Sequence, residues 1–309
     1  MIPLRAMINE EVSAINSDPL EFSPVATGGV YSSPTTSREP SIKIRPGRAS
    51  VTAELKEAFD QRELLYFFIW RDLKIRYKQT TLGAAWVILQ PLLMALVFAV
   101  FMGMLARVPS DGLPYAVFAY AGLLPWVFFS NSVSSSSQCL IANNHLITKV
   151  YFPRMLLPLV VIGVRLVDFF IAFIVLIFLM LYYRLQMSWG MLVFPFLVAQ
   201  VALLALGVGM WTATLNTRYR DVGVVLPVVL QLWMFVSPVV YPSSLVPEGW
   251  RFLYDLNPMT GVIEGMRSAL FGLKFNWAGL AMSALLTLFS LLYFIYDFCR
   301  KQDELVDII

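Results

Sequence analysis

The chain has 309 residues, of which 58% are hydrophobic and 14% charged, and its mean hydropathy is +0.70. A soluble domain averages roughly 45–50% apolar and about 25% charged residues, so this composition excludes an ordinary soluble domain. The net charge of +3 is small and gives no support to nucleic-acid binding. The two cysteines belong to no CxxC or His/Cys cluster, so neither a metal site nor a disulfide framework is predicted.

Residues 1–58 contain 8 serines and 6 prolines and have no apolar run long enough for a signal-peptide core. Such a composition cannot bury enough apolar surface to order itself. We therefore predict a disordered cytoplasmic tail at 1–58 and a membrane domain at 59–309. A regulatory or partner-binding role for the tail is the alternative.

The pattern becomes helical from Glu54. One helical stripe is apolar and aromatic and consists of Tyr66, Ile69, Trp70, Leu73 and Tyr77. A helix with this stripe beside a basic face is typical of the headgroup layer, with rings in the membrane and cations on lipid phosphates. Alternatively, the cations contact the phosphates of a lipid-linked substrate. The candidate phosphate contacts are Arg71, Lys74, Arg76 and Lys78.

Long apolar stretches predict an all-α integral membrane protein with six transmembrane helices. The spans are expected at residues 82–106, 113–135, 163–183, 189–215, 222–241 and 277–298. Pro91 is expected to kink the first span. The second ends in SNSVSSSS, and the fourth carries Gly207 and Gly209. These small residues permit close helix packing.

Two charged residues lie in the third span. Residues 169–183 alone give ~22 Å of helix, short of the ~30 Å hydrocarbon core, so the span must begin near Gly163. Arg165 is then expected to snorkel to the cytoplasmic surface, and Asp168 to face protein rather than lipid. We predict a local ion pair between them. A substrate or proton role for Asp168 is the alternative.

Residues 242–276 are apolar enough to enter a membrane but too short and too charged to cross it. Pro258 and Gly261 interrupt this segment. Two re-entrant half-helices fit the composition, since irregular backbone at membrane depth must be shielded by protein. Glu264 and Arg267 stand three residues apart and are candidates for an ion pair.

Six spans place both termini on one side of the membrane. Near the span ends, that side has eleven Lys and Arg residues and the other side has five. The positive-inside bias makes both termini cytoplasmic. The segment 138–154 is then cytoplasmic too, and a disulfide is not expected on the reducing side.

The segment QCLIANNHLITKVYFPR (138–154) is a short polar and basic stretch between long apolar runs. Its mixture of residues predicts a contact surface for a soluble motor protein. The chain has no GxxxxGK[ST], GxSxG or HExxH motif, and its single histidine, His145, has no sequence partner. We expect no catalytic residue, no enzyme activity, and no cofactor or metal in this chain.

Aromatic residues are a second candidate feature, because aromatic faces stack on sugar rings with few fixed charges and would let a sugar chain slide. Trp126, Phe128 and Phe129 cluster where a break in the second span is expected. The other three candidates lie in the fifth span or at its end. Core packing and interfacial belts are the alternative role. The candidate channel residues are Trp126, Phe128, Phe129, Trp233, Phe235 and Tyr241.

Six blocks resemble one known family, in the family's order. They are RYKQTTLGAAWVILQPLL (76–93), AGLLPWVFFSNSV (121–133), NNHLITKVYFPR (143–154), LNTRYRD (215–221), LWMFVSPVVYPSSLVPEGWR (232–251) and LNPMTGVIEGMRSALFG (256–272). Over about residues 60–300 the chain resembles the type 2 permease subunit of ABC exporters that move O-antigen, teichoic acid and related polysaccharides. The O-antigen branch looks nearer than the capsule branch. The long tail departs from the family's usual short amino terminus.

The resemblance implies a homodimer in the bacterial inner membrane, each subunit binding one separate ATPase subunit that holds ATP and Mg. It implies a polysaccharide cargo on an undecaprenyl pyrophosphate carrier and an aromatic-lined channel between the subunits. It also implies an interface helix at 63–79, half-helices at 244–273 and a coupling helix at 143–153. The residues assigned to ATPase coupling are Asn143, Asn144, His145, Leu146, Ile147, Thr148, Lys149, Val150, Tyr151, Phe152, Pro153 and Arg154.

Two other functions stay open. The first is the same architecture with another cargo, such as teichoic acid, capsule polysaccharide, a drug or haem. The second is a membrane glycosyltransferase or polymerase, which needs catalytic carboxylates in the longest loop, 242–276. The acidic residues Glu248, Asp255 and Glu264 in that loop have no metal-type spacing. No internal repeat is evident, which weakens the case for a secondary transporter.

Overall fold

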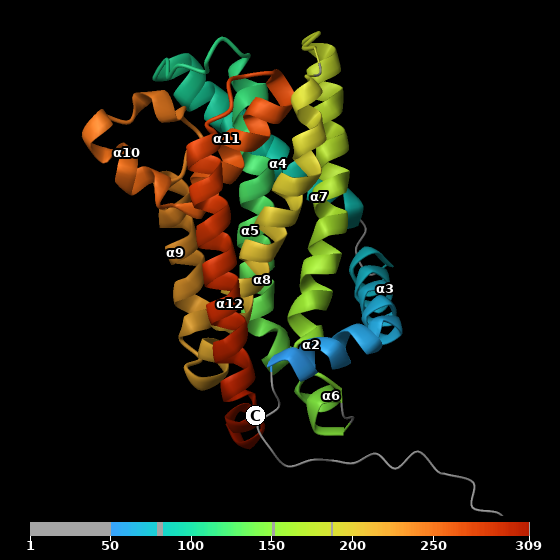
Figure 1. Cartoon of the computed structure of the whole chain (residues 1–309). Coiled ribbons are helices and arrows are strands. Elements are labelled where there is room, and N and C mark those ends of the chain that lie inside the picture. Colours follow the sequence, from blue (N-terminus) through green and yellow to red (C-terminus); the bar gives the residue numbers. More distant parts are fainter. Residues whose placement is uncertain (1–50, 79–82, 150–151, 187, 309) are drawn as a thin grey trace, which may run out of the picture. The chain divides into compact units, whose positions relative to one another are not determined.

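The computed structural model describes residues 51–78, 83–149, 152–186 and 188–308, and every regular element in these ranges is helical (Figure 1). The long helices are α4 (Gly83–Phe98), continued by the π-helix η1 (Ala99–Leu105), then α5 (Tyr115–Ala142), α7 (Leu156–Tyr182), α8 (Phe194–Arg218) and α12 (Trp277–Ile308). A short 3₁₀ turn, η2 (Trp189–Val193), leads into α8. The predicted all-α class is confirmed for the described residues.

Within the described residues, five stretches are long and apolar enough to cross a membrane. They are Ala85–Leu105, Tyr115–Ala142, Leu156–Tyr182, Trp189–Arg218 and Trp277–Lys301. These correspond to five of the six predicted spans. The remaining prediction falls on α9 (Val222–Val236), which has only 15 residues. Its helix ends before Pro238, because proline has no N–H and disfavours helical backbone in the residue before it.

Helix α5 lies at the centre of the bundle. It packs against α4, α7, α8, α9 and α11, and 78% of its most apolar window is buried. Gly209 of α8 approaches it so closely that an added Cβ would lie 2.8 Å from the Cβ of Ser136. At Gly207, an added Cβ would lie 3.1 Å from the Cα of Leu291 in α12. These distances confirm the predicted close packing of small residues. Such packing matters in lipid, because van der Waals contact and not the hydrophobic effect holds helices together there.

The predicted break near Trp126 is wrong. Helix α5 runs without interruption from Tyr115 to Ala142, with Pro125 inside it. It also extends seven residues beyond the predicted end of the second span. Neighbouring helices bury this stretch, and such an environment lets a membrane helix accommodate a proline.

Helix α2 (Val51–Asp60) begins inside the stretch predicted to be a disordered tail. That expectation is wrong for residues 51–58. VTAELKEAFD is rich in the helix formers Ala, Leu, Glu and Lys, and its composition differs from the Ser- and Pro-rich segment before it. Residues 1–50 lie outside the described part of the chain, so disorder there stays a prediction. Helix α3 (Arg62–Lys78) follows and matches the helix predicted at 63–79, apart from Gln79, which is not described. Its place at the membrane interface stays a prediction.

The described elements have two distinct ends (Figure 1). Helix α6 (Asn144–Lys149) and the last turns of α12 lie at one end, and α10 (Glu248–Asp255) and α11 (Pro258–Phe271) lie at the other. The 3₁₀ turn η3 (Ser243–Leu245) precedes α10. Two short helices are thus present where half-helices are predicted, while their depth in a membrane stays a prediction. Helix α11 begins at an Asn257 cap followed by Pro258 and ends at Gly272, whose φ is +70°. These are typical helix start and stop signals.

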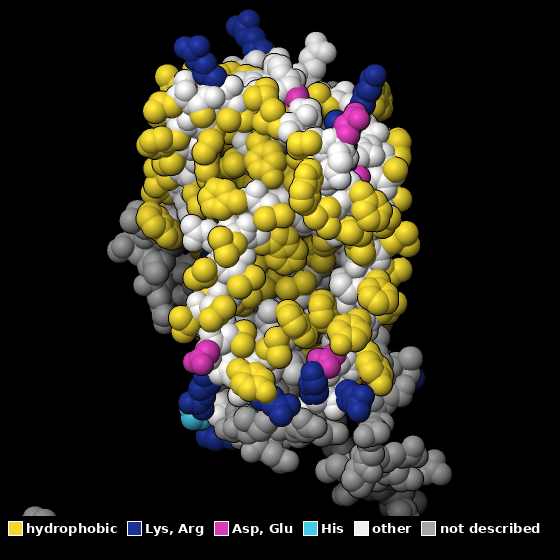
Figure 2. Space-filling view, turned by 90° about the vertical axis from the view of Figure 1, so that its left-hand side faces the viewer, with side chains coloured by type: hydrophobic (Ala, Val, Ile, Leu, Met, Phe, Trp, Pro, Cys, Tyr) yellow, Lys and Arg dark blue, Asp and Glu magenta, His cyan; other side chains and the backbone are white. Residues whose placement is uncertain are grey.

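Hydrophobic side chains cover the middle of the face that carries α9 and α10 (Figure 2). Lys, Arg, Asp and Glu gather toward the two ends of that face. Elsewhere, the most apolar window of α4 and η1 is only 11% buried. An apolar surface of this extent is exceptional for a soluble monomer and is expected of helices that face lipid or a partner subunit.

Candidate functional site

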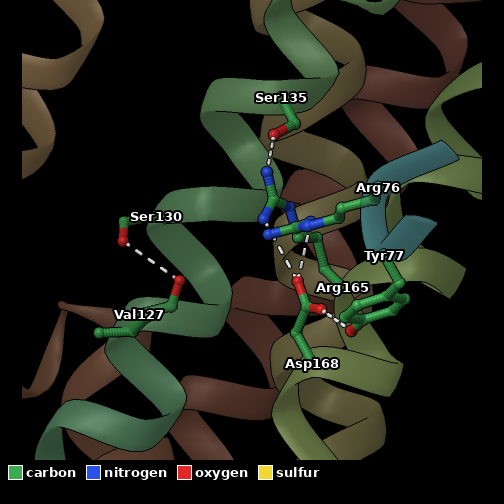
Figure 3. Close-up of polar contacts among 7 residues, drawn as sticks. All are labelled: Arg76, Tyr77, Val127, Ser130, Ser135, Arg165 and Asp168. Carbon is green, nitrogen blue, oxygen red and sulfur yellow. Dashed lines mark hydrogen bonds and ion pairs between the residues drawn. The ribbon is translucent and has the colours of Figure 1, made fainter. Parts of the chain in front are cut away.

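A polar cluster joins α3 to α7 and α5 (Figure 3). Its centre is the Asp168 carboxylate on α7, whose side chain is 13% exposed. The Arg76 guanidinium, from the last turn of α3, lies 2.9 Å from Asp168 Oδ2. The neighbouring Tyr77 hydroxyl donates to Oδ1 at 2.7 Å. The carboxylate thus holds the end of α3 against α7.

Arg165 completes the cluster from one turn earlier on α7. Its Nη1 lies 3.3 Å from Asp168 Oδ2, which confirms the predicted i,i+3 ion pair. Its Nη2 donates to the Ser135 hydroxyl on α5 at 2.5 Å. The side chain is 18% exposed, so other protein groups surround most of it, and the expected snorkelling toward the membrane surface stays a prediction. The partly exposed Ser135 hydroxyl and the Asp168 carboxylate satisfy the guanidinium within the protein.

The cluster holds two guanidinium groups and one carboxylate and so has an excess of one positive charge. Burial, the hydrogen bond to Asp168 and the negative charge of that carboxylate together raise the pKa of Tyr77 well above its usual range. Tyr77 therefore stays neutral and acts as a hydrogen-bond donor. Since Asp168 accepts from three side chains on two helices, the arrangement supports a mechanical joint better than a proton relay.

Apolar contacts hold α3 in the same place. Ile69 reaches α7 at Gly163, where an added Cβ would lie 2.5 Å from Ile69 Cδ1. Phe68 is buried, and its ring meets that of Phe152 edge-on with centroids 5.8 Å apart. Phe152 lies just beyond α6, in the predicted coupling segment. Helix α3 therefore contacts the predicted coupling segment at one point and α7 at others.

The predicted coupling segment has an inner and an outer side. Leu146 and Ile147 of α6 pack against the core, while His145, Thr148 and Lys149 are exposed. Asn143 ends α5 with its side-chain amide donating to the Cys139 carbonyl at 2.8 Å. Val150 and Tyr151, also predicted for coupling, lie outside the described residues. The exposed residues give α6 a polar, basic outer surface suited to contact with another protein.

The four predicted phosphate contacts do not behave alike. Arg76 faces Asp168, and Arg71 pairs with Asp72 at 2.8 Å and lies over the Phe68 ring at 4.8 Å. Lys74 and Lys78 are exposed. Two of the four cations, Arg71 and Arg76, thus form ion pairs within the protein, because carboxylates lie close to them.

Three of the predicted channel aromatics lie in the core of the bundle. Trp126, Phe128 and Phe129 are each at most 4% exposed. Trp233 is partly buried and meets Phe129 edge-on at a centroid distance of 5.2 Å. In contrast, Phe235 is 49% exposed, and Tyr241 is partly exposed. The packing favours the core role for the α5 aromatics and leaves Phe235 and Tyr241 as surface candidates.

At the α10–α11 end of the bundle, Arg267 of α11 is 4% exposed. It forms no ion pair with Glu264, so that predicted pairing is wrong. Its terminal nitrogens donate to the carbonyls of Pro238 and Val239, each at 2.7 Å, and of Phe118 at 3.2 Å. Its guanidinium also lies 3.6 Å from the centre of the Phe118 ring. The carbonyls left unpaired where α9 ends attract the guanidinium more effectively than Glu264 does, because a buried carbonyl needs a donor.

Only part of these sites could be predicted from the sequence. The Arg165–Asp168 pair follows from helical spacing alone. Ser135, the turn of Arg76 toward Asp168 and the Phe68–Phe152 contact were missed, because they join residues far apart in the chain. The sequence pattern places Tyr77 only in an aromatic stripe, so the hydrogen bond that its hydroxyl donates to Asp168 was not predicted.

A family model described as ABC-2 type transporter matches residues 63–271, more than half of the chain. This chain belongs to the ABC-2 type transporter family. The match extends from the interface helix through α11 and so includes both the Asp168 cluster and the coupling segment.

Curated relatives give the same picture. The O-antigen export system permease protein of Myxococcus xanthus is 30% identical over 216 residues, covering 69% of this chain and 82% of that protein. Its counterpart in Klebsiella pneumoniae is 29% identical, with coverage of 66% and 79%. The polysialic acid transport protein of Escherichia coli is 26% identical, with coverage of 71% and 87%. The ABC-2 chain is therefore a multi-pass membrane permease, and the predicted resemblance is confirmed.

Proposed function

We propose that this ABC-2 permease forms the membrane path of an ATP-driven exporter that moves a lipid-linked polysaccharide out of the cytoplasm across the inner membrane. Two of the three relatives described above are named for O-antigen export and the third for polysialic acid transport, and this supports a polysaccharide cargo. Lipopolysaccharide assembly is the biosynthetic route that such an O-antigen-like polymer would enter.

The observation that carries the proposal is the set of contacts that runs from Phe152, just beyond α6, through α3 to α7. The exposed side of α6 is the docking surface for a separate ATPase subunit. Movement of that segment reaches Phe68 through Phe152, then Arg76 and Tyr77 along α3, and finally Asp168. ATP and Mg bind to the partner, and this chain supplies the moving helices.

A homodimer with two ATPase subunits completes the proposed exporter. The surface along α4 and η1, which the protomer leaves uncovered, offers room for a second copy. Both termini and α6 face the cytoplasm. Lys74 and Lys78 remain available for lipid headgroups or the carrier pyrophosphate, and Phe235 and Tyr241 are the retained channel candidates.

The test is deletion of this gene in its native strain, followed by complementation. We expect the lipid-linked polymer to accumulate inside the cell and to return to the surface on complementation. Normal surface polysaccharide without internal accumulation would contradict the proposal and favour a drug or haem cargo. Incorporation of labelled sugar by the purified chain alone would favour a glycosyltransferase.

A further inference from the structure

A polar cavity of about 360 Å³ lies at the end of the bundle opposite α6, among η3, α10, α11 and the turn before α12. It lies within the size range of small-ligand sites, roughly 300–1,000 Å³. No part of the proposed ATP-coupling route passes through it. Its charged lining residues are Asp111, Arg251, Asp255, Glu264, Arg267 and Lys274.

The charges in the cavity are balanced, with three carboxylates and three cations. Glu264 Oε1 and Arg267 Nε are buried and have no hydrogen-bond partner within the described residues. A buried polar atom without a partner is costly, so the Glu264 carboxylate and the Arg267 guanidinium favour a ligand that brings both a donor and an acceptor. The Tyr254 ring adds an apolar surface to the wall.

This lining excludes several ligand classes. Among the described residues, no group of three His, Cys, Asp or Glu side chains is placed to hold a metal ion. An anion would meet three carboxylates, and a cation would meet two guanidiniums and an ammonium. A neutral molecule with many hydroxyl groups can donate to the carboxylates and accept from the cations together. Sugars also present C–H faces suited to an aromatic ring such as Tyr254.

We propose that this cavity is a saccharide subsite, which binds one unit of a neutral or near-neutral polysaccharide at the exit side of the permease. The inference rests on the proposed export function, which places the α10–α11 end outside the cytoplasm. A subsite at the exit offers hydrogen bonds to the emerging polysaccharide. These replace hydrogen bonds to water, and each sugar unit passes them to the next as the polymer moves. Because one cavity belongs to each protomer, a dimer would hold two such subsites.

The test uses the complete complex of this chain with its ATPase partner, in detergent. The probe is the repeat-unit oligosaccharide released by mild acid from the strain's own surface polysaccharide, and its binding is measured by calorimetry. We expect Asp255→Ala and Glu264→Gln each to weaken binding about tenfold or more, since a hydrogen bond to a charged group is lost. Glu248→Ala is the matched control on α10. Glu248 is 91% exposed, lies outside the cavity lining and is expected to leave affinity unchanged.

A labelling experiment reports on the cavity without relying on affinity. Cys139 and Cys299 are buried, so a cysteine introduced by Asp255→Cys should be the main target of a maleimide. The oligosaccharide should slow that labelling and leave labelling of Glu248→Cys unchanged. Absence of binding to the unmodified complex, or equal binding by the Asp255 and Glu264 variants, would overturn the subsite. If the same complex still exports polymer, the proposed function survives that result.

Discussion

At the scale of single residues, Asp168 connects the interface helix to the membrane bundle. Its carboxylate is shared by Arg76, Arg165 and Tyr77. Removing its charge while keeping its shape leaves two guanidiniums facing each other with no counter-charge between them. Truncating one partner of a buried charged group is costly for this reason.

We therefore expect Asp168→Asn to loosen α3 without preventing membrane insertion. Amide exchange in α3 should rise by roughly tenfold or more, as a hydrogen bond to a charged group contributes about 1.5–3 kcal/mol. Export should fall while ATP hydrolysis continues. Asp297→Asn, which removes the partner of Lys301 on α12, is the matched control. Unchanged exchange in α3 after Asp168→Asn would refute the joint.

Arg267 has a different role, as a donor to backbone carbonyls at the end of α9. Arg267→Met keeps much of the side-chain volume but leaves the Pro238, Val239 and Phe118 carbonyls without this donor. Each such loss costs about 1–3 kcal/mol, so the thermal midpoint in detergent should fall by about 5 °C or more. Arg251→Met is the control at the same end, because Arg251 is 54% exposed. Equal midpoints for the two variants would show that the carbonyl contacts contribute little.

At the scale of elements, the prediction concerns α6 and the residues that follow it. Lys149 is exposed on α6, and Arg154 lies just before α7. Reversing both charges with Lys149→Glu and Arg154→Glu should uncouple ATP hydrolysis from export. Insertion should be unaffected, because neither residue lies in a candidate span.

The measurement is ATPase rate and polymer export in the same reconstituted vesicles. Arg218→Glu with Arg220→Glu provides a matched pair, as both are exposed and lie at the turn between α8 and α9. Normal export by the Lys149 and Arg154 double variant would remove α6 from the coupling route.

Element types were readily predicted from the sequence, whereas their ends and their contacts were not. Apolar runs located five spans, because each helix must shield its own backbone in lipid. The end of α9 at Val236 depended on Pro238 and on an arginine 29 residues further along the chain. Likewise, the burial of Trp126 depends on how five helices surround α5. Such long-range contacts leave no periodic signal in one sequence.

At the scale of the whole molecule, sidedness is the first testable property. The α6 end should face the cytoplasm and the α10–α11 end the opposite side. A membrane-impermeant maleimide should label Arg184→Cys in intact spheroplasts and should label His145→Cys only after permeabilisation. The buried native cysteines keep the background low. Labelling of His145→Cys from outside would reverse the topology and contradict the proposed ATPase contact.

Assembly is the second property at this scale. One chain has a mass of 34.9 kDa, so two chains give about 70 kDa of protein. Light scattering of the detergent-solubilised chain, corrected for bound detergent, should report that value. Replacing exposed apolar residues on α4 and η1 with lysine, for instance Leu96→Lys, should shift it toward one chain if that surface is the interface. Persistent dimers would move the interface to another exposed helix, such as α9.

The anchoring of Arg267 also decides where this molecule can bend. Its side chain connects α11 to the turn after α9 and to the first turns of α5. The turn after α9 also packs closely on α5 at Gly122, where an added Cβ would clash with the Val239 carbonyl oxygen. Pulling α11 away alone would separate the guanidinium from the three backbone carbonyls that accept its hydrogen bonds. If the structure opens near α10, then α11, the turn after α9 and the first turns of α5 must therefore move together as one rigid unit. The hinge of that movement must lie closer to the α6 end of the helices.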